Sequence, residues 1–248
     1  MDSQNKEKKF RKSSSKTEKD NNSLMTADNA IQLIRNYFDK TTEDKHGRYL
    51  SWRHCYNVFS KNRNVVDEQT LDYLSLHLAF YLASWGMYRG STFLLQKDYK
   101  IHIPVVKIIQ EEQYNPLFAI SAEELVKEEN RILLVDNLSK KIKDYYKQEP
   151  SVFVGRVNNA TDTLITKILL GTLGCVPAYD DYYTRAVKKY NVSSGIYNMK
   201  SIEKIAKFYC DNSDVFEKLR CELSACGTEY PPMKLMDMCF WQDSLENQ

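Results

Sequence analysis

A lysine and an aspartate thirteen positions apart are the residues of this chain best suited to chemistry. Lys167 lies in an apolar stretch with helical spacing, and Asp180 follows a connection that contains Gly171, Gly174 and Pro177. A lysine amine is a nucleophile only when it is neutral, so it needs desolvation or cationic neighbours that lower its pKa. A nearby aspartate can activate the amine and offset positive charge that develops on a substrate. We therefore expect the two side chains to face one cleft.

The segment around this pair resembles the helix-hairpin-helix DNA glycosylases, especially divergent members related to 8-oxoguanine DNA glycosylase. The resemblance covers about residues 160–190 and consists of a lysine, an apolar stretch and the element Pro177-Ala178-Tyr179-Asp180. A Leu-Pro-Gly-Val-Gly type hairpin, usual in that superfamily, does not precede Lys167. The resemblance implies a hydrolase of base excision, a DNA glycosylase and AP lyase in which Lys167 forms a Schiff base at the sugar C1′ and Asp180 activates it.

The same resemblance implies contacts with DNA, because family members turn the target base out of the duplex into an aromatic pocket. Close backbone approach at Gly86 and Gly90, beside Arg89, would also suit a phosphate or a base. The side chains expected to bind nucleic acid are Arg89, Arg185, Lys188 and Lys189 for phosphates, and Trp52, Trp85, Tyr179, Tyr182 and Tyr183 for stacking.

A structural role explains the same pair without chemistry. Asp180 and Asp181 in the first turn of a helix stabilise its dipole, and a lysine of an amphipathic helix usually lies on the solvated face. The alternative function is a non-catalytic helical module that binds a protein or a nucleic acid, in a regulatory or phage-defence setting. A separation well over about 8 Å between Lys167 and Asp180 would exclude cooperation between them.

Other chemistry-bearing patterns are weaker. The four C-terminal cysteines lack the CxxC pair with which a closed metal site usually begins, and the four histidines have no HxxxH spacing. The phosphate-cradling sequences GxxxxGK[ST] and GxGxxG are absent. We predict no metal, no other cofactor and no nucleotide cofactor.

Helices must position the candidate pair, because 8 Gly and 6 Pro in 248 residues are too few for the turns of a sandwich or barrel. The fold class predicted is all-α, with at most a minor strand at residues 151–155. Around the pair, the pattern predicts one helix from Ala160 to Leu170 and a second from Pro177 to about Tyr190. Asp67 is a predicted N-cap, and Ser121 with Glu124 has the spacing of a capping box.

Charge and composition divide the chain into a tail and a body. Residues 1–23 hold seven Lys or Arg against four Asp or Glu and little to bury, so residues 1–24 are predicted to be a disordered basic tail. Residues 25–248 are predicted to form a single helical domain or two closely packed lobes. Residues 140–200 hold ten Lys or Arg against five acids, which suits contacts with DNA.

The location of the protein is inferred from two features that the sequence lacks. It has no run of about 18 apolar residues, and its N-terminus is charged where a secretory signal would be apolar. We therefore expect a cytoplasmic protein without membrane contact, whose six cysteines stay reduced. The oligomeric state is left open.

Overall fold

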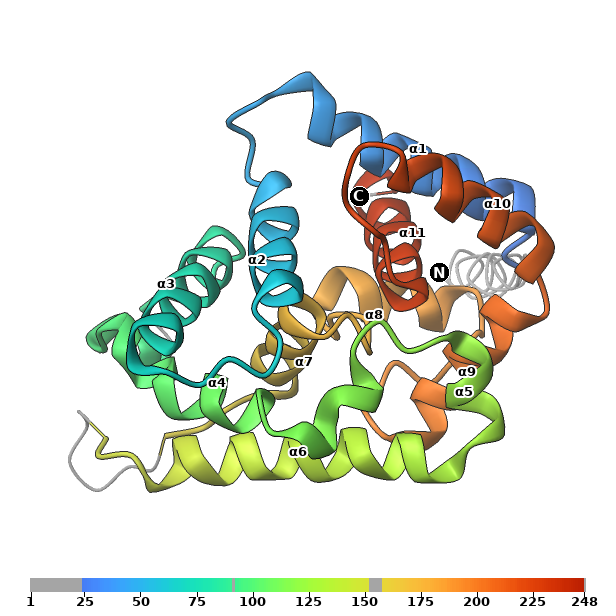
Figure 1. Ribbon diagram of the computed structural model, residues 1–248. Coiled ribbons are helices and arrows are strands. Elements are labelled where there is room, and N and C mark those ends of the chain that lie inside the picture. Colours follow the sequence, from blue (N-terminus) through green and yellow to red (C-terminus); the bar gives the residue numbers. More distant parts are fainter. Residues whose placement is uncertain (1–23, 91, 152–157, 248) are drawn as a thin grey trace, which may run out of the picture.

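The computed structural model describes residues 24–90, 92–151 and 158–247, and in these ranges the chain is all-α and contains no strand (Figure 1). The predicted fold class is confirmed. The basic tail to residue 23, and the expected strand apart from Ser151, lie outside the described residues. The α-helices are α1 (Ala27–Glu43), α2 (Leu50–Lys61), α3 (Glu68–Ser84), α4 (Ile103–Ile109), α5 (Ala122–Lys127), α6 (Glu129–Gln148), α7 (Asp162–Thr172), α8 (Asp181–Lys189), α9 (Met199–Cys210), α10 (Ser213–Ser224) and α11 (Pro232–Glu246), with short 3-10 helices η1 (Phe93–Gln96), η2 (Tyr99–His102) and η3 (Glu112–Leu117).

Side-chain caps fix where several of these helices begin. The Asp67 carboxylate accepts a hydrogen bond from the Thr70 N–H and caps α3, as predicted. Ser121 and Glu124 form the predicted capping box at the start of α5. Because such caps depend on neighbours three residues away, they are readable from the sequence.

The start of α8 differs from the prediction. The helix begins at Asp181 and not at Pro177, because Asp180 is its N-cap. The Oδ1 of Asp180 accepts a hydrogen bond from the Tyr183 N–H at 3.1 Å, and its carbonyl accepts one from the Thr184 N–H at 2.9 Å. Proline has no polar side chain with which to satisfy these free N–H groups, so the helix begins where the aspartate does.

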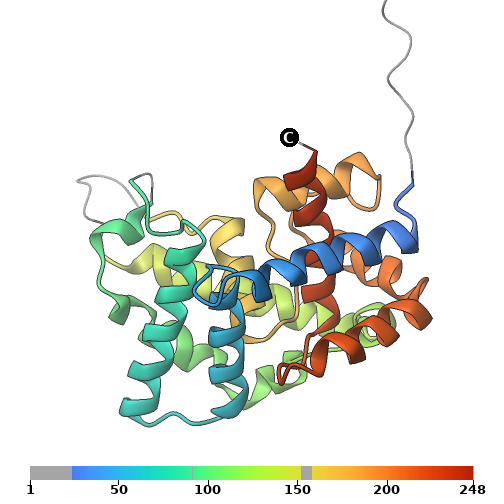
Figure 2. The ribbon, with the colours of Figure 1, turned by 90° about the horizontal axis from the view of Figure 1, so that it is seen from above.

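The helices form two packed groups. In both views α2, α3 and α4 lie on one side, and α9, α10 and α11 lie on the other (Figures 1 and 2). Helix α7 packs against α2, α3 and α6, whereas α11 packs against α1, α8, α9 and α10. Buried apolar side chains form one cluster that runs from Met25 to Trp241 through both groups. The connection between α7 and α8 therefore joins one group of helices to the other.

Within the described ranges, no helix combines the length and the apolar character needed to cross a membrane.

Gly174 allows the connection after α7 to turn back. Its φ is +69°, and a Cβ at this position would overlap the ring of Pro231. We expect Gly174→Ala to lower the free energy of unfolding by about 2–4 kcal/mol, because the cost of left-handed backbone strain and the cost of overpacking against Pro231 add together. Urea unfolding would measure this loss.

Gly227 is the matched control for this variant. Its φ is +88°, and among the described residues no atom beyond its chain neighbours lies within 4 Å of the position that a Cβ would take, so Gly227→Ala should cost only about 1–2 kcal/mol. Equal losses in the two variants would contradict the overlap with Pro231.

Candidate active-site cleft

Lys167 and Asp180 meet in a direct ion pair. The Nζ of Lys167 lies 2.7 Å from the Oδ2 of Asp180, and the two side chains are 4% and 16% exposed. This distance is within hydrogen-bond reach and far below the separation at which cooperation would be excluded. Asp180 has two tasks, since its other oxygen, Oδ1, caps α8. The hydrogen bond from the first turn of α8 thus fixes the position of the Asp180 carboxylate.

The connection between α7 and α8 is tied back onto α7, and this brings Asp180 to the lysine. The N–H of Tyr179 donates to the Oγ1 of Thr166 at 2.9 Å, and the hydroxyl of Thr163 donates to the carbonyl of Tyr179 at 2.9 Å. Thr166 directly precedes Lys167 on α7, and Tyr179 directly precedes Asp180. The two reactive side chains are therefore positioned by hydrogen bonds of their immediate neighbours.

The pair lies on the wall of a cleft of about 590 Å³. Such a volume is in the range of pockets that enclose small organic ligands. The described residues of its lining come from the connections between α1 and α2 and between α6 and α7, from the segment after α3, and from α7, α8 and α11. Side chains from both groups of helices therefore meet in this cleft.

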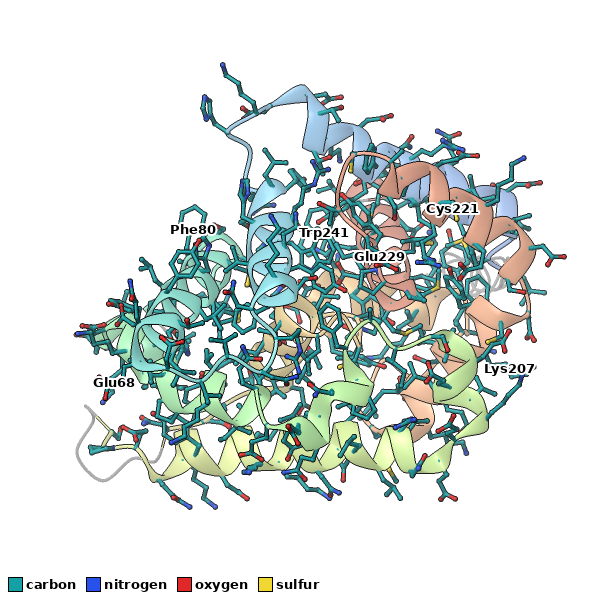
Figure 3. All side chains as sticks on the ribbon, in the orientation of Figure 1. Glu68, Phe80, Lys207, Cys221, Glu229 and Trp241 are labelled. Atoms are coloured by element: carbon teal, nitrogen blue, oxygen red, sulfur yellow. The ribbon has the colours of Figure 1, made fainter. Side chains whose placement is uncertain are left out.

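Aromatic rings form the part of the wall nearest the lysine. The Nζ of Lys167 lies 5.3 Å from the ring centroid of Trp85. Trp85 contacts Trp241 edge to face at 5.5 Å, and Tyr182 is stacked on Trp241 at 5.2 Å. Figure 3 labels Trp241 near the centre of the molecule, between α2 and α11. These rings offer apolar faces on which a planar ligand can stack.

Arg48 adds a cation to this aromatic wall. It lies between α1 and α2, lines the cleft, and places its guanidinium 4.9 Å from the ring centroid of Trp85. Its side-chain N–H groups form no hydrogen bond or ion pair with the described residues. They are available to an anionic group or a carbonyl of a ligand.

The starts of two helices also face the cleft. Thr161, the N-cap of α7, and Asp180, the N-cap of α8, both line it. Helix N-termini carry partial positive charge, and the carboxylates of Asp162 at α7 and of Asp180 and Asp181 at α8 offset it here. Arg48 and Arg89 contribute full positive charges to the lining, and Asp181 contributes a negative one. The cleft therefore combines a lysine–carboxylate pair, stacking surfaces and groups suited to phosphate.

Among the expected stacking residues, Trp85 and Tyr182 line the cleft, but the other three lie in the core. Tyr183 has no exposed surface, Tyr179 is 4% exposed and Trp52 is 2% exposed. The hydroxyl of Tyr179 lies 3.0 Å from that of Ser201, and Tyr183 packs against Phe240. Tyr183 lies on the face of α8 that packs against α11, and Tyr179 lies in the buried connection before α8, so these two side chains are part of the core.

Of the four residues expected to contact phosphates, one lines the cleft and three lie on α8 outside its lining. Arg89 lines the cleft, whereas Arg185 and Lys188 are exposed on α8. Lys189 forms an ion pair with Asp243 at 3.1 Å. That pair ties the end of α8 to α11, so Lys189 has a structural partner already.

Arg48 and Trp241, which form the cationic and aromatic wall beside Lys167, were not among the sequence candidates. Arg48 lies in a short connection without a motif, and Trp241 lies in an apolar helix that reads as ordinary core. Only its neighbours in the sequence could have drawn attention to Arg48: Gly47 before it is typical of a turn, and Tyr49 after it offers an aromatic contact.

Neither a protein-family model, nor a curated protein, nor a solved structure matches this chain. In the part of the chain that the structure describes, no three His, Cys, Asp or Glu side chains are grouped so as to hold a metal ion. The functional argument therefore starts from the cleft and its lysine–aspartate pair.

Proposed function

We propose that this protein is a DNA glycosylase and AP lyase that excises a damaged or modified base, with Lys167 as nucleophile and Asp180 as its partner. The observation that carries the proposal is the 2.7 Å contact between Lys167 and Asp180 on the wall of the cleft. A nucleophile and the group that activates it must lie within hydrogen-bond reach, and this pair does.

The proposed reaction begins with transfer of a proton from Lys167 to Asp180. Filling the cleft with substrate displaces water, and a less polar environment favours a neutral pair over an ion pair. The neutral amine then attacks C1′ of the sugar while the bond from C1′ to the base breaks, and the base leaves with the bonding electrons. The proton held by Asp180 is available to the departing base. The attached nitrogen, now an ammonium, returns a proton to Asp180. The C1′–O4′ bond then breaks as the nitrogen lone pair forms the C=N bond of the Schiff base, and O4′ takes the proton from Asp180.

The walls of the cleft suit an extruded nucleotide. Trp85 and Tyr182 are half-buried and present ring surface beside the lysine. Stacking of a base on such rings contributes about 1–3 kcal/mol, and Arg48 and Arg89 supply donors for the flanking phosphates.

Covalent trapping tests the proposal. Duplexes that carry a panel of modified bases, or an abasic site, would be mixed with the protein and sodium borohydride, which reduces a Schiff base to a stable amine. We expect a covalent complex with at least one duplex and a complete loss of it in Lys167→Gln, because glutamine keeps the polarity of the side chain without an amine. Gel mobility and peptide mass spectrometry would identify the attached residue.

Lys207→Gln is the matched control, because Lys207 lies on the outside of α9 in an exposed ion pair with Asp211 (Figure 3). This variant should trap DNA as the unchanged protein does. Absence of a complex with every duplex, or trapping that survives Lys167→Gln, would contradict the proposal. Binding of DNA without trapping, retained after both Lys167 and Asp180 are neutralised, would instead support a non-catalytic module.

A further inference from the structure

A second buried lysine–aspartate pair lies at the start of α11. The Nζ of Lys234 is 2.7 Å from the Oδ2 of Asp237, and the side chains are 3% and 8% exposed. The ammonium also lies 4.8 Å from the ring centroid of Tyr37 and 5.0 Å from that of Trp52. Removing two charges from water costs about as much as their attraction returns, so a buried pair contributes little net stability. Its position relative to the cleft suggests another role.

Asp237 holds the segment that carries Asp180. Its Oδ1 accepts a hydrogen bond from the backbone N–H of Ala178 at 3.1 Å, while its Oδ2 accepts from Lys234. Ala178 precedes Asp180 by two residues, and both Ala178 and Asp237 are nearly inaccessible to solvent. The Asp237 carboxylate thus links Lys234 to the backbone segment that carries Asp180.

The two pairs also line one small cavity. Lys167, Asp180, Lys234 and Asp237 all line one cavity of about 10 Å³, which is about the room of a single water molecule. Tyr81 lines it as well, and burial followed by the negative charge of Asp237 raises the pKa of this phenol. Because all four charged side chains are largely buried, water screens them little, and a charge on one pair acts strongly on the other.

Gly171 makes room for the phenol. A Cβ at position 171 would lie 2.5 Å from the Tyr81 ring, so only a glycine lets this ring approach α7 so closely. The ring of Tyr81 thereby reaches, from α3, the cavity that both ion pairs line.

We propose that Lys234 and Asp237 are positioning residues for Lys167: they hold Asp180 in place through Ala178 and balance the charge around the lysine across the shared cavity. This inference rests on the proposed function, in which Lys167 is the nucleophile. Loss of the negative charge of Asp237 should favour the neutral amine of Lys167, and loss of the positive charge of Lys234 should favour its ammonium form. The charged and titratable groups that line the cleft or the small cavity together with Lys167 are Asp180, Asp181 and Tyr182 at α8, Lys234 and Asp237 on α11, Tyr81 on α3, and Arg48 and Arg89.

Reductive methylation of Lys167 tests this coupling without DNA. Formaldehyde and cyanoborohydride methylate only neutral amines, and peptide mass spectrometry would follow Lys167 as a function of pH. Below the pH at which the rate levels off, we expect Asp237→Asn to raise the rate about tenfold and Lys234→Gln to lower it about tenfold. The double variant, in which both charges are absent, should return close to the original rate. A merely structural role would move both single variants in the same direction.

Lys207 serves as the internal reference, because its exposed amine should be methylated equally in every variant. Folded single variants that leave the Lys167 rate unchanged, or shift it in one common direction, would overturn the inference. If a single variant does not fold, Lys234→Arg and the double variant keep the local charge balanced and must match the original rate. A tenfold departure in either would overturn the inference.

The two proposals can fail separately. Opposite shifts in methylation, together with no trapping on any DNA, would remove the glycosylase function and keep the coupling. Trapping through Lys167 that is accompanied by no shift in folded variants would remove the coupling alone.

Discussion

Asp180→Asn is expected to lower the rate of base excision about 10²–10⁴-fold, the usual contribution of a positioned acid or base. Asparagine caps a helix as well as aspartate does, so the Tyr183 N–H keeps its acceptor. The amide cannot take the proton of Lys167, however, and it carries no charge with which to stabilise a positive sugar. Single-turnover excision, on the duplex that gives the strongest trapping, would measure the loss.

Asp67→Asn is the matched control, because it makes the same change at the N-cap of α3, which does not line the cleft. Its excision rate should equal that of the unchanged protein. Asp180→Ala adds a second comparison: it removes the cap as well as the charge and should cost about 1 kcal/mol more in stability than the asparagine variant. Excision by Asp180→Asn at the original rate would remove Asp180 from the proposed mechanism.

The second large effect is expected at low pH and comes from His102. This side chain has no exposed surface, and its two ring nitrogens lie 2.8 Å from the hydroxyl of Tyr88 and 2.6 Å from that of Tyr146. Burial lowers the pKa of His102 to about 3, from the ordinary value of 6.5 for a histidine. A neutral imidazole satisfies both contacts, with one nitrogen donating and the other accepting.

The sign of the pH effect follows from these two values. Below pH 6.5 the unfolded chain binds a proton at His102 that the folded protein does not bind until about pH 3. Stability is therefore fully present above 6.5 and falls by roughly 1.4 kcal/mol for each pH unit below it, or about 3 kcal/mol at pH 4.5. Urea unfolding at pH 7.5 and at pH 4.5 would measure the change.

His102→Gln separates this contribution from that of the carboxylates. Glutamine keeps one donor and one acceptor but does not titrate, so the variant should lose about 3 kcal/mol less than the histidine protein between the two pH values. Its stability at pH 7.5 should be lower, because the contacts with Tyr88 and Tyr146 will fit less well. Identical pH slopes for the two proteins would contradict the assignment to His102.

Local signals in the sequence account for much of the fold. The caps at Asp67 and Ser121 and the apolar stripes of the helices were predicted because they depend on residues within a turn of one another. The start of α8 was placed too early, since Pro177 is compatible with a first turn but Asp180 has the side chain that caps it. The aromatic residues Tyr179 and Tyr183 were assigned to a ligand, although their spacing is also that of a buried face.

The cleft depends on contacts that the sequence does not display. Lys167 and Asp180 were selected because they are close along the chain and carry complementary chemistry. Arg48 and Trp241 come from distant segments, and only the packing of the two groups of helices brings them together. Lys234 and Asp237 were missed for a different reason: α11 is buried along almost its whole length, so it has no polar face against which two charged residues would stand out.

The double use of Asp180 links the folding of one helix to the reactivity of one amine. The carboxylate that satisfies the first turn of α8 also neutralises Lys167, so fraying of that turn would leave the ammonium without its counter-charge. Hydrogen exchange at the Tyr183 amide would then report, through a single resonance, whether the pair of Lys167 and Asp180 is assembled. A ligand that closes the cleft should slow this exchange, which gives a way to screen for substrates before any turnover is detected.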